Sequence, residues 1–193
     1  MKIDNFETDR FIVKKFSLKF INKNYLDWFN DCEVNKFITF NPKNLDDLKN
    51  DVLKTLKLKN AYFFAIFHKK KHIGNIKIHN IDYQQNKAWL GILIGDKNFR
   101  GIGVTPEIVK FIKISLIKKK IYFLRLNVDK KNIQAIKSYL KSKSYVFGNP
   151  VFSGMNIKKI ERAIKENYEL VLIHPQSLSR EQTRKDLKIL GKK

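Results

Sequence analysis

The stretch from Leu90 to Thr105, LGILIGDKNFRGIGVT, decides the fold and directs the search for a functional site. It begins with an apolar segment typical of a strand and passes into a turn that contains Gly101 and Gly103. An amphipathic segment starts at Pro106, so the order is strand, glycine turn and helix. Glycines let the backbone approach a ligand closely, and the first turn of a helix offers unpaired N–H groups with a partial positive charge. This arrangement predicts a binding site for phosphate groups.

The spacing of the glycines excludes two common phosphate-binding loops. The sequence contains no G-x-x-x-x-G-K-[ST], and Pro106 occupies the position where a dinucleotide-binding G-x-G-x-x-G needs its last glycine. On this evidence alone, a tight turn with a purely structural role is the alternative to a phosphate site.

Two motifs narrow the choice, and the first is part of the glycine turn. Arg100, Gly103 and Thr105 match the pattern R/Q-x-x-G-x-G/A of the GNAT acetyltransferase superfamily, with Thr105 where Gly or Ala is usual. The segment YLDWFNDCEVNKFI also resembles the N-terminal part of ribosomal-protein and amino-sugar acetyltransferases of this family.

The second motif follows a strand-like FLRLNV. Asn132, Ala135 and Tyr139 match the family pattern N-x-x-A-x-x-x-Y, and Ser144-Tyr145 replaces the Gly-Phe pair that usually follows. Two motifs in the family's order are far more specific than either alone. The chain therefore resembles a GNAT acetyltransferase over residues 8–174.

The pattern of apolar residues predicts the elements of an α/β (α+β) fold. Strands are expected at 10–16, 61–67, 72–81, 88–95, 122–128, 145–152 and 168–173. Helices are expected at 22–31, 45–58, 132–142 and 157–165, and from Thr105 (as N-cap) to the lysines at 118–120. A short helix or a turn is expected at 33–40. The resemblance implies a single GNAT-like domain over 1–175, with a mixed, mostly antiparallel sheet of six or seven strands flanked by helices. Residues 176–193 form a polar tail, expected to be helical, with no assigned function.

The resemblance also implies where acetyl-CoA, the expected co-substrate, is bound. Backbone groups of Ile92, Leu93 and Ile94 pair with its pantetheine arm by strand addition, and one N–H polarises the thioester carbonyl. The pyrophosphate is expected on the N–H groups of Gly101, Ile102, Gly103, Val104 and Thr105, with Arg100 beside the phosphates.

The same resemblance assigns two roles to the second motif. Asn132 hydrogen-bonds the pantetheine arm, and Tyr139 is the general acid that protonates the leaving thiolate. The general base is left open between His79, which has the most suitable ordinary pKa, Asp82, Glu33 and a chain of water molecules. For Tyr139, the alternative is a half-buried core residue.

Trp28 and Phe37 are expected to contribute to the acceptor site, with ordinary core packing as the alternative. The expected reaction is acetylation of a primary amine, with an amino sugar or its nucleotide favoured as acceptor. The α-amine of a ribosomal or other protein is the close rival, and a basic GNAT-like binding module without catalysis is the third reading.

The composition of the chain limits which of these functional hypotheses are plausible. The chain has 193 residues, 43% of them hydrophobic, with one cysteine and a formal net charge of +22. No apolar run reaches the roughly 18 residues of a membrane span, and the four histidines lack the spacing of metal ligands. Most of the positive charge is lysine spread along the chain, so solvated surface is favoured over nucleic-acid binding. We expect a cytoplasmic enzyme without a metal, and leave a homodimer open.

Overall fold

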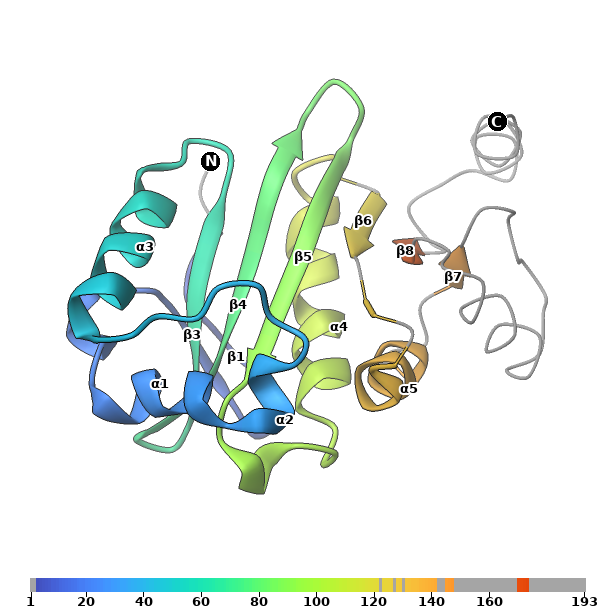
Figure 1. Ribbon diagram of the computed structural model, residues 1–193. Coiled ribbons are helices and arrows are strands. Elements are labelled where there is room, and N and C mark those ends of the chain that lie inside the picture. The colour runs from blue at the N-terminus through green and yellow to red at the C-terminus, as the bar shows by residue number, and fades with distance from the viewer. Residues whose placement is uncertain are drawn as a thin grey trace, which may run out of the picture. The chain divides into compact units, whose positions relative to one another are not determined.

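The computed structural model describes residues 3–121, 123–126, 128–129, 131–141, 145–147 and 170–173 (Figure 1). The chain forms two compact units, and each is described by itself. The first unit comprises Met1–Ile81 and Leu90–Val104, and the second comprises Asp82–Trp89 and Thr105–Lys193. Strand β5 (Lys87–Ile94) therefore begins in the second unit and ends in the first.

The first unit is a sheet with helices on one face. Its strands follow the order β1-β2-β3-β4-β5. Strand β2 pairs with β1 and with β3, and β3 pairs with β4; all three pairings are antiparallel. Its elements before β5 are β1 (Phe6–Glu7), β2 (Ile12–Lys15), η1 (Leu18–Phe20), α1 (Lys23–Asp27), η2 (Trp28–Asn30), α2 (Cys32–Asn35), α3 (Leu45–Lys57), β3 (Tyr62–His68) and β4 (Lys71–Asp82). After β5 comes η3 (Lys97–Phe99).

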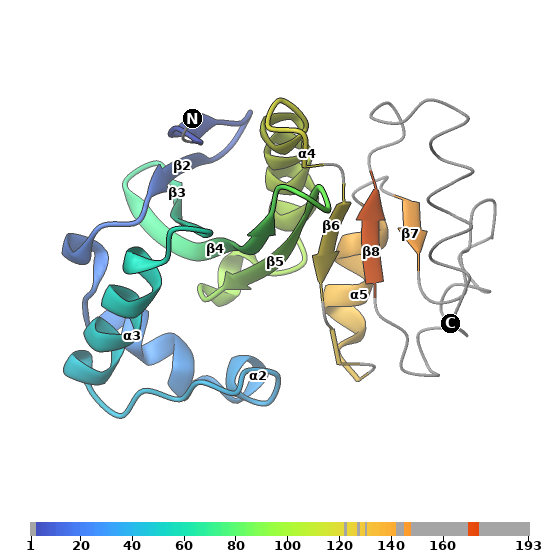
Figure 2. The ribbon, with the colours of Figure 1, turned by 90° about the horizontal axis from the view of Figure 1, so that it is seen from above.

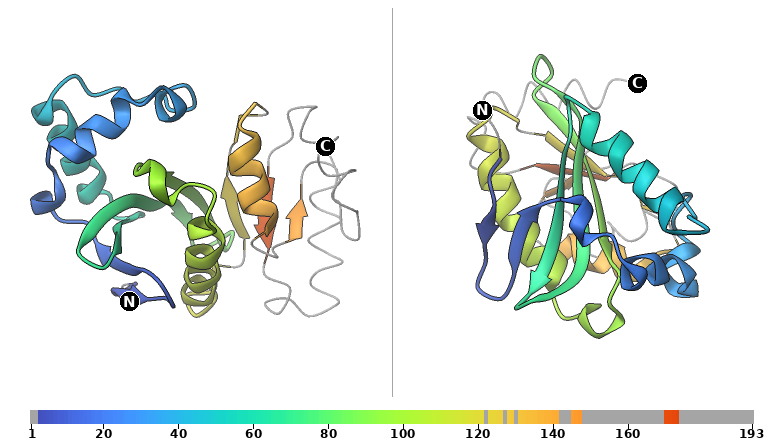
Figure 3. Two further views of the ribbon diagram at one scale, coloured as in Figure 1. Left: turned by 90° about the horizontal axis from the view of Figure 1, so that it is seen from below. Right: turned by 90° about the vertical axis from the view of Figure 1, so that its left-hand side faces the viewer.

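Helix α3 shows how local sequence fixes an element. The Asn44 side chain accepts a hydrogen bond from the Asp47 N–H at 2.9 Å and caps the first turn. Acidic residues stand in the first turn and lysines in the last, which complements the helix dipole. Leu48 and Val52 lie one turn apart and are fully buried, and α3 packs against β3 through this face (Figure 3).

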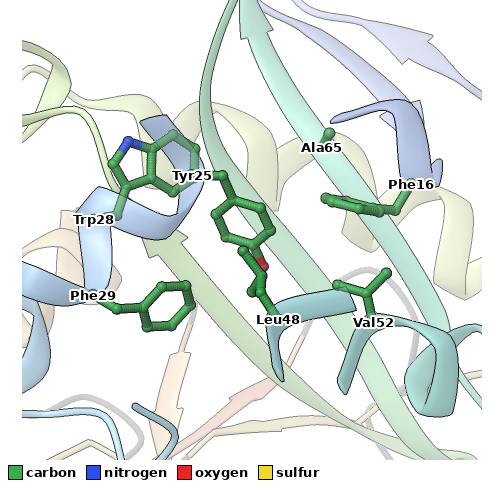
Figure 4. Close-up of a cluster of buried hydrophobic side chains, with 7 residues drawn as sticks. All are labelled: Phe16, Tyr25, Trp28, Phe29, Leu48, Val52 and Ala65. Carbon is green, nitrogen blue, oxygen red and sulfur yellow. The ribbon is translucent and has the colours of Figure 1, made fainter. Parts of the chain in front are cut away.

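An aromatic cluster fills the space between these helices and the sheet. Figure 4 shows its seven members, which come from the end of β2, from α1, η2 and α3, and from β3. They are Phe16, Tyr25, Trp28, Phe29, Leu48, Val52 and Ala65. Because interiors are packed as densely as organic crystals, this cluster fixes the position of α1 and η2 above the sheet.

The β3–β4 hairpin turns where the lysine run predicts it. Lys69 has a left-handed φ of 54° in the turn. The register then shifts between Ile66 and Phe67, because Ile66 is opposite Gly74 and Phe67 is opposite His72. The extra residue of β4 forms a bulge beside Gly74.

The second unit contains β6 (Phe123–Leu126), β7 (Tyr145–Phe147), β8 (Leu170–Ile173), α5 (Ile133–Lys141) and most of α4 (Val104–Ile117). The start of β5 pairs in parallel with β6 from Lys87–Phe123 to Trp89–Arg125. Strand β8 lies between β6 and β7 and is antiparallel to both, and α5 covers one face of these strands (Figure 2).

The lysines at 118–120 end α4 as expected. The helix stops at Ile117, and Lys120 adopts a left-handed φ of 60° just beyond it. In α4, the buried side chains are Val104, Thr105, Ile108, Val109, Ile112, Lys113 and Leu116. None of the helices in the described ranges is both long and apolar enough to cross a membrane.

The expected fold class is confirmed, with differences at element ends. Strand β1 was not expected, because two residues are too short for a recognisable pattern. Helix α4 begins at Val104, so Thr105 is inside the helix and is not its N-cap. Proline is tolerated in the first turn, where N–H groups have no helical partner, so Pro106 does not fix the first residue. The expected helix at 157–165 and the tail at 176–193 lie outside the described residues.

Candidate functional site

The glycine turn has the conformation that its sequence predicts. Gly101 and Gly103 have φ angles of 77° and 88°, in the left-handed region that other residues rarely adopt. Gly101 and Ile102 are exposed, and α4 starts one residue after Gly103. The turn therefore joins an exposed glycine-rich backbone to the first N–H groups of a helix, the combination that binds phosphate.

Arg100 does not have the contacts expected of a residue beside the phosphates. Its Nε donates to the Ile94 carbonyl at 3.0 Å, and its Nη2 donates to the Gly95 carbonyl. Its Nη1 forms an ion pair with Asp31 Oδ2 at 2.9 Å. Each guanidinium nitrogen thus has a partner within the first unit. The side chain ties the end of β5 to the start of α2, and its place beside the phosphates remains a prediction.

Asp31 makes this connection rigid. Its other carboxylate oxygen accepts from the Glu33 N–H at 2.9 Å and caps α2. The Glu33 N–H, then Arg100, and finally the charge of Lys97 hold the pKa of Asp31 below its ordinary value, against the opposite effect of partial burial. The carboxylate is therefore ionised at neutral pH. No local pattern predicts this role, because Asp31 and Arg100 are far apart along the chain.

Arg10 lies at the glycine turn and was not expected there. Its Nη1 donates to the Ile102 carbonyl at 3.1 Å. A Cβ on Gly103 would lie 3.4 Å from Arg10 Nη2, so the guanidinium also covers one side of that glycine. Arg10 precedes β2, and 92 positions separate it from Ile102. Only the folded chain brings the two together.

The end of β5 is held tightly against β4. The Ile73 carbonyl accepts from the N–H groups of Gly95 and Asp96 at 3.0 and 3.1 Å. A Cβ on Gly74 would come within 2.4 Å of the Leu93 carbonyl oxygen. The ladder with β6 involves Lys87–Trp89, at the opposite end of β5. Ile92, Leu93 and Ile94 are half-buried, and their assignment to the pantetheine arm remains a prediction.

Trp28 is a core residue in the structure. Its side chain is 8% exposed, and its ring centroid is 5.1 Å from that of Tyr25. A Cβ on Gly95 would lie only 1.8 Å from Trp28 Cδ2, so the indole rests directly on the backbone after β5. This placement favours packing over direct contact with an acceptor. Phe37 is half-buried, with Lys36 Nζ 5.2 Å from its ring centroid.

A buried polar network beneath the aromatic cluster was also missed. His72 Nε2 is 3.1 Å from the Gly74 carbonyl and 2.8 Å from Asn75 Oδ1. Burial lowers the pKa of His72, so the ring is neutral at pH 7 and Nε2 carries the proton toward these two acceptors. Burial, together with the charge of Asp51, raises the pKa of Tyr25, and the polar side chain of Asn75 opposes this. Among the described residues His72 Nδ1 and Asn75 Nδ2 have no hydrogen-bond partner, so the network is only partly satisfied.

His79, the favoured candidate base, lies away from the expected thioester position. Gly91 is next to Lys77 across the two strands, since a Cβ there would be 4.0 Å from Lys77 Cβ. The residue opposite Ile92 is then position 76, and His79 is roughly 10 Å further along β4 at about 3.3 Å per residue. Burial and the charge of Lys77 lower the pKa of His79, which leaves a neutral proton acceptor. A base must be within hydrogen-bond reach, so His79 could act only through a chain of water molecules.

The other two candidate bases are engaged locally. Glu33 pairs with Lys36 at 2.7 Å on the surface. Asp82 accepts from the N–H groups of Gln84 and Gln85 at 3.0 and 2.9 Å and shapes the turn after β4. These contacts give both carboxylates a structural role, and the base stays unassigned.

The second motif belongs to helix α5 of the second unit: Asn132 directly precedes the helix, and Tyr139 lies within it. Asn132 accepts from the Ala135 N–H at 3.1 Å through Oδ1 and so caps the helix. Tyr139 is 6% exposed, and burial raises its pKa to about 12. The phenol therefore keeps its proton at neutral pH, as a general acid must. The roles of both residues toward the coenzyme remain predictions.

In the ranges that the structure describes, His, Cys, Asp and Glu side chains form no group of three or more suited to a metal ion. The single cysteine, Cys32, is exposed at the start of α2.

Comparison with known families decides the identity of this fold. A family model described as acetyltransferase (GNAT) domain matches residues 10–142, which is more than half of the chain and spans both units. The chain belongs to the GNAT acetyltransferase family. This membership places it among acetyltransferases that use acetyl-CoA. The comparison with curated proteins found no match.

Solved GNAT structures share the fold at low sequence identity. The ribosomal L7/L12 alpha-N-protein acetyltransferase RimL, in complex with coenzyme A, superposes with a TM-score of 0.68 at 10% identity, covering 87% of this chain and 94% of RimL. Microcin C7 self-immunity acetyltransferase MccE, with acetyl-CoA and AMP, gives 0.66 at 15% identity, covering 85% and 91%. Aminoglycoside acetyltransferase AAC(6')-Ib, with coenzyme A, gives 0.65 at 12% identity, covering 90% and 99%. At these identities the likeness establishes the fold alone.

Proposed function

We propose that this GNAT acetyltransferase transfers the acetyl group of acetyl-CoA to a primary amine. The observation that carries the proposal is the glycine turn, with two left-handed glycines and an exposed backbone directly before α4. Backbone N–H groups from Gly101 to Thr105 bind the pyrophosphate. The strand segment Ile92–Ile94 binds the pantetheine arm by strand addition.

In the reaction, the amine nitrogen attacks the thioester carbonyl carbon, the C–S bond breaks, and the amine loses a proton. A backbone N–H at the end of β5 stabilises the charge on the carbonyl oxygen. Tyr139 gives its proton to the departing thiolate, and its high pKa keeps that proton available throughout the neutral range. His79, which is neutral, receives the amine proton through water.

The favoured acceptor is a small molecule, an amino sugar or an amino-sugar nucleotide. This preference rests on the resemblance of the β4 and β5 sequences, HIGNIKIHNID and GILIGDKNFRG, to such enzymes. The α-amine of a protein N-terminus is the second candidate, since RimL, a ribosomal alpha-N-protein acetyltransferase, shares the fold.

Thermal unfolding with acetyl-CoA tests the coenzyme site directly. At about 100 times its Kd, acetyl-CoA should stabilise the protein by roughly 2.7 kcal/mol. Sulfate and ATP at matched ionic strength are the controls for a chain with a net charge of +22. An equal shift with all three anions would contradict a coenzyme site, and salt-sensitive RNA binding without acetyl transfer would support the basic module instead.

Two further measurements separate the chemistry from the acceptor. Tyr139→Phe should reduce kcat by about 10²-fold or more and leave the acetyl-CoA Kd nearly unchanged. Wild-type turnover in this variant would refute the general-acid role. An acceptor screen with glucosamine, a UDP-linked amino sugar and a serine-initiated peptide then identifies the acceptor class by mass spectrometry of the product.

A further inference from the structure

Arg10 occupies a preorganised position beside the glycine turn. It lies in the β-turn that joins β1 to β2, where the Thr8 N–H donates to the Phe11 carbonyl at 2.8 Å. The Phe11 N–H donates back to Thr8 Oγ1 at 3.0 Å. The guanidinium is also 4.9 Å from the centroid of the Phe11 ring, a distance that gives a cation–π contact. The backbone that carries Arg10 is therefore fixed at both ends of its turn.

A row of rings holds this β-turn next to the loop that leads to the glycines. Phe11 is 1% exposed, and its ring centroid is 6.0 Å from that of His68 at the end of β3. The His68 ring centroid is in turn 5.0 Å from that of Phe99 in η3, one residue before Arg100. The hairpin and the glycine turn are thus connected by packing within the first unit, independently of the Arg10 hydrogen bond.

The hydrogen bond of Arg10 fixes the orientation of the Ile102–Gly103 peptide group. In a trans peptide the C=O and N–H point in opposite directions, so holding the Ile102 carbonyl toward Arg10 turns the Gly103 N–H away from it. Gly103, on one side of this peptide, has a left-handed φ and no side chain to restrict it, so the peptide can rotate. A fixed donor on the carbonyl removes that freedom.

We propose that Arg10 is a positioning residue of the coenzyme site, which holds the Ile102–Gly103 peptide so that the Gly103 N–H faces the pyrophosphate. The inference rests on the proposed function, because it assigns Arg10 to the same site. It adds a second arginine to the one that the motif names: Arg100 bonds β5 and Asp31, and Arg10 reaches the turn from the β1–β2 hairpin.

The test compares coenzyme affinity in Arg10→Gln, Arg10→Lys and the wild type by titration calorimetry with coenzyme A. Lys49→Gln, an exposed change on α3 that removes the same charge, is the matched control. We expect Arg10→Gln to weaken binding about tenfold, the effect of one well-placed hydrogen bond, and Lys49→Gln to weaken it less than twofold. Arg10→Lys should restore part of the affinity, because lysine supplies one donor to Ile102 and cannot also cover Gly103.

Two controls separate peptide orientation from simple charge and from instability. The loss in Arg10→Gln should persist at 0.5 M salt, where screening removes most effects of an exposed charge. The turnover of S-acetylpantetheine, which lacks the pyrophosphate, should be unchanged in the variant.

The outcomes are separable. Wild-type coenzyme A affinity in Arg10→Gln, full rescue by Arg10→Lys with loss of the effect at high salt, or an equal defect with S-acetylpantetheine would each overturn the assignment. If the wild-type protein itself fails to bind coenzyme A, the proposed function falls, and the role of Arg10 falls with it.

Discussion

Gly95→Ala tests the packing at the end of β5 most sharply. The new methyl carbon would be placed 1.8 Å from Trp28 Cδ2, 2.2 Å from Cε3 and 2.3 Å from Cγ. Carbon atoms in contact are normally about 3.5–4.0 Å apart, so the indole would have to move by roughly 1.5–2 Å. Trp28 is 8% exposed, with the His72 and Tyr25 rings at centroid distances of 4.9 and 5.1 Å. It has little room to move.

The expected cost follows from overpacking of a dense core. Inserting a methyl group into such a site typically lowers the free energy of unfolding by about 1–3 kcal/mol. We expect about 3 kcal/mol for Gly95→Ala, because the new methyl group would clash with three ring atoms at once. For a chain of this size, that corresponds to a fall in Tm of about 6–12 °C. Urea unfolding followed by circular dichroism measures the free energy of unfolding directly.

Gly91→Ala is the matched control on the same strand. Its Cβ would be 4.0 Å from Lys77 Cβ, an ordinary contact, and alanine restricts the unfolded chain more than glycine does. We expect this variant to be neutral or stabilised by about 0.4–1 kcal/mol. Equal stability of the Gly95→Ala and Gly91→Ala variants would refute the close contact between Trp28 and the β5 backbone.

A double-mutant cycle isolates the contact itself. In a Trp28→Ala background the added methyl group no longer clashes with the indole, so Gly95→Ala should change the free energy of unfolding little. The coupling energy should then approach about 3 kcal/mol. Additive effects would mean that the cost of Gly95→Ala arises from backbone strain and not from Trp28.

Two further predictions concern the caps of α2 and α3. Asp31→Asn should lower the free energy of unfolding by about 1 kcal/mol at pH 7, because it removes the charge paired with Arg100 and keeps an oxygen for the Glu33 N–H. The folded-state pKa of Asp31 is lowered, so its contribution is present above the ordinary Asp value and is lost as pH falls through the lowered pKa; a difference between variant and wild type that does not shrink in urea titrations below pH 4 would contradict the ion pair. Asn44→Ala should cost about 1 kcal/mol by removing the bond to the Asp47 N–H, whereas Asn44→Ser should retain most of the stability; identical unfolding curves for the two variants would rule out the cap.

Local sequence was sufficient for most of the elements. Asn44 and the lysine turn after β3 act within a few residues of themselves, and the lysines at 118–120 end α4 as predicted. The glycine turn follows the same logic, because a left-handed backbone needs glycine wherever it occurs. The exact start of α4 did not follow, since Pro106 fits several positions in a first turn.

The roles of the arginines show the limit of this reasoning. The motif places Arg100 at the glycine turn, yet the motif contains no information on Asp31, which takes up part of its guanidinium. Arg10 belongs to no motif and reaches the turn from the β1–β2 hairpin. Trp28 likewise matches an acceptor-site segment in sequence, but the close approach of Gly95 makes it part of the core.

The sequence by itself determined the family, the order of most strands and helices, and the left-handed conformation of the glycine turn. These properties depend on backbone conformation and on residues close together along the chain. The tertiary structure alone decided which charged and aromatic side chains meet at that turn and at the end of β5. Hydrogen bonds and ion pairs act over about 3 Å, and only folding brings residues as distant as Arg10 and Ile102 within that distance.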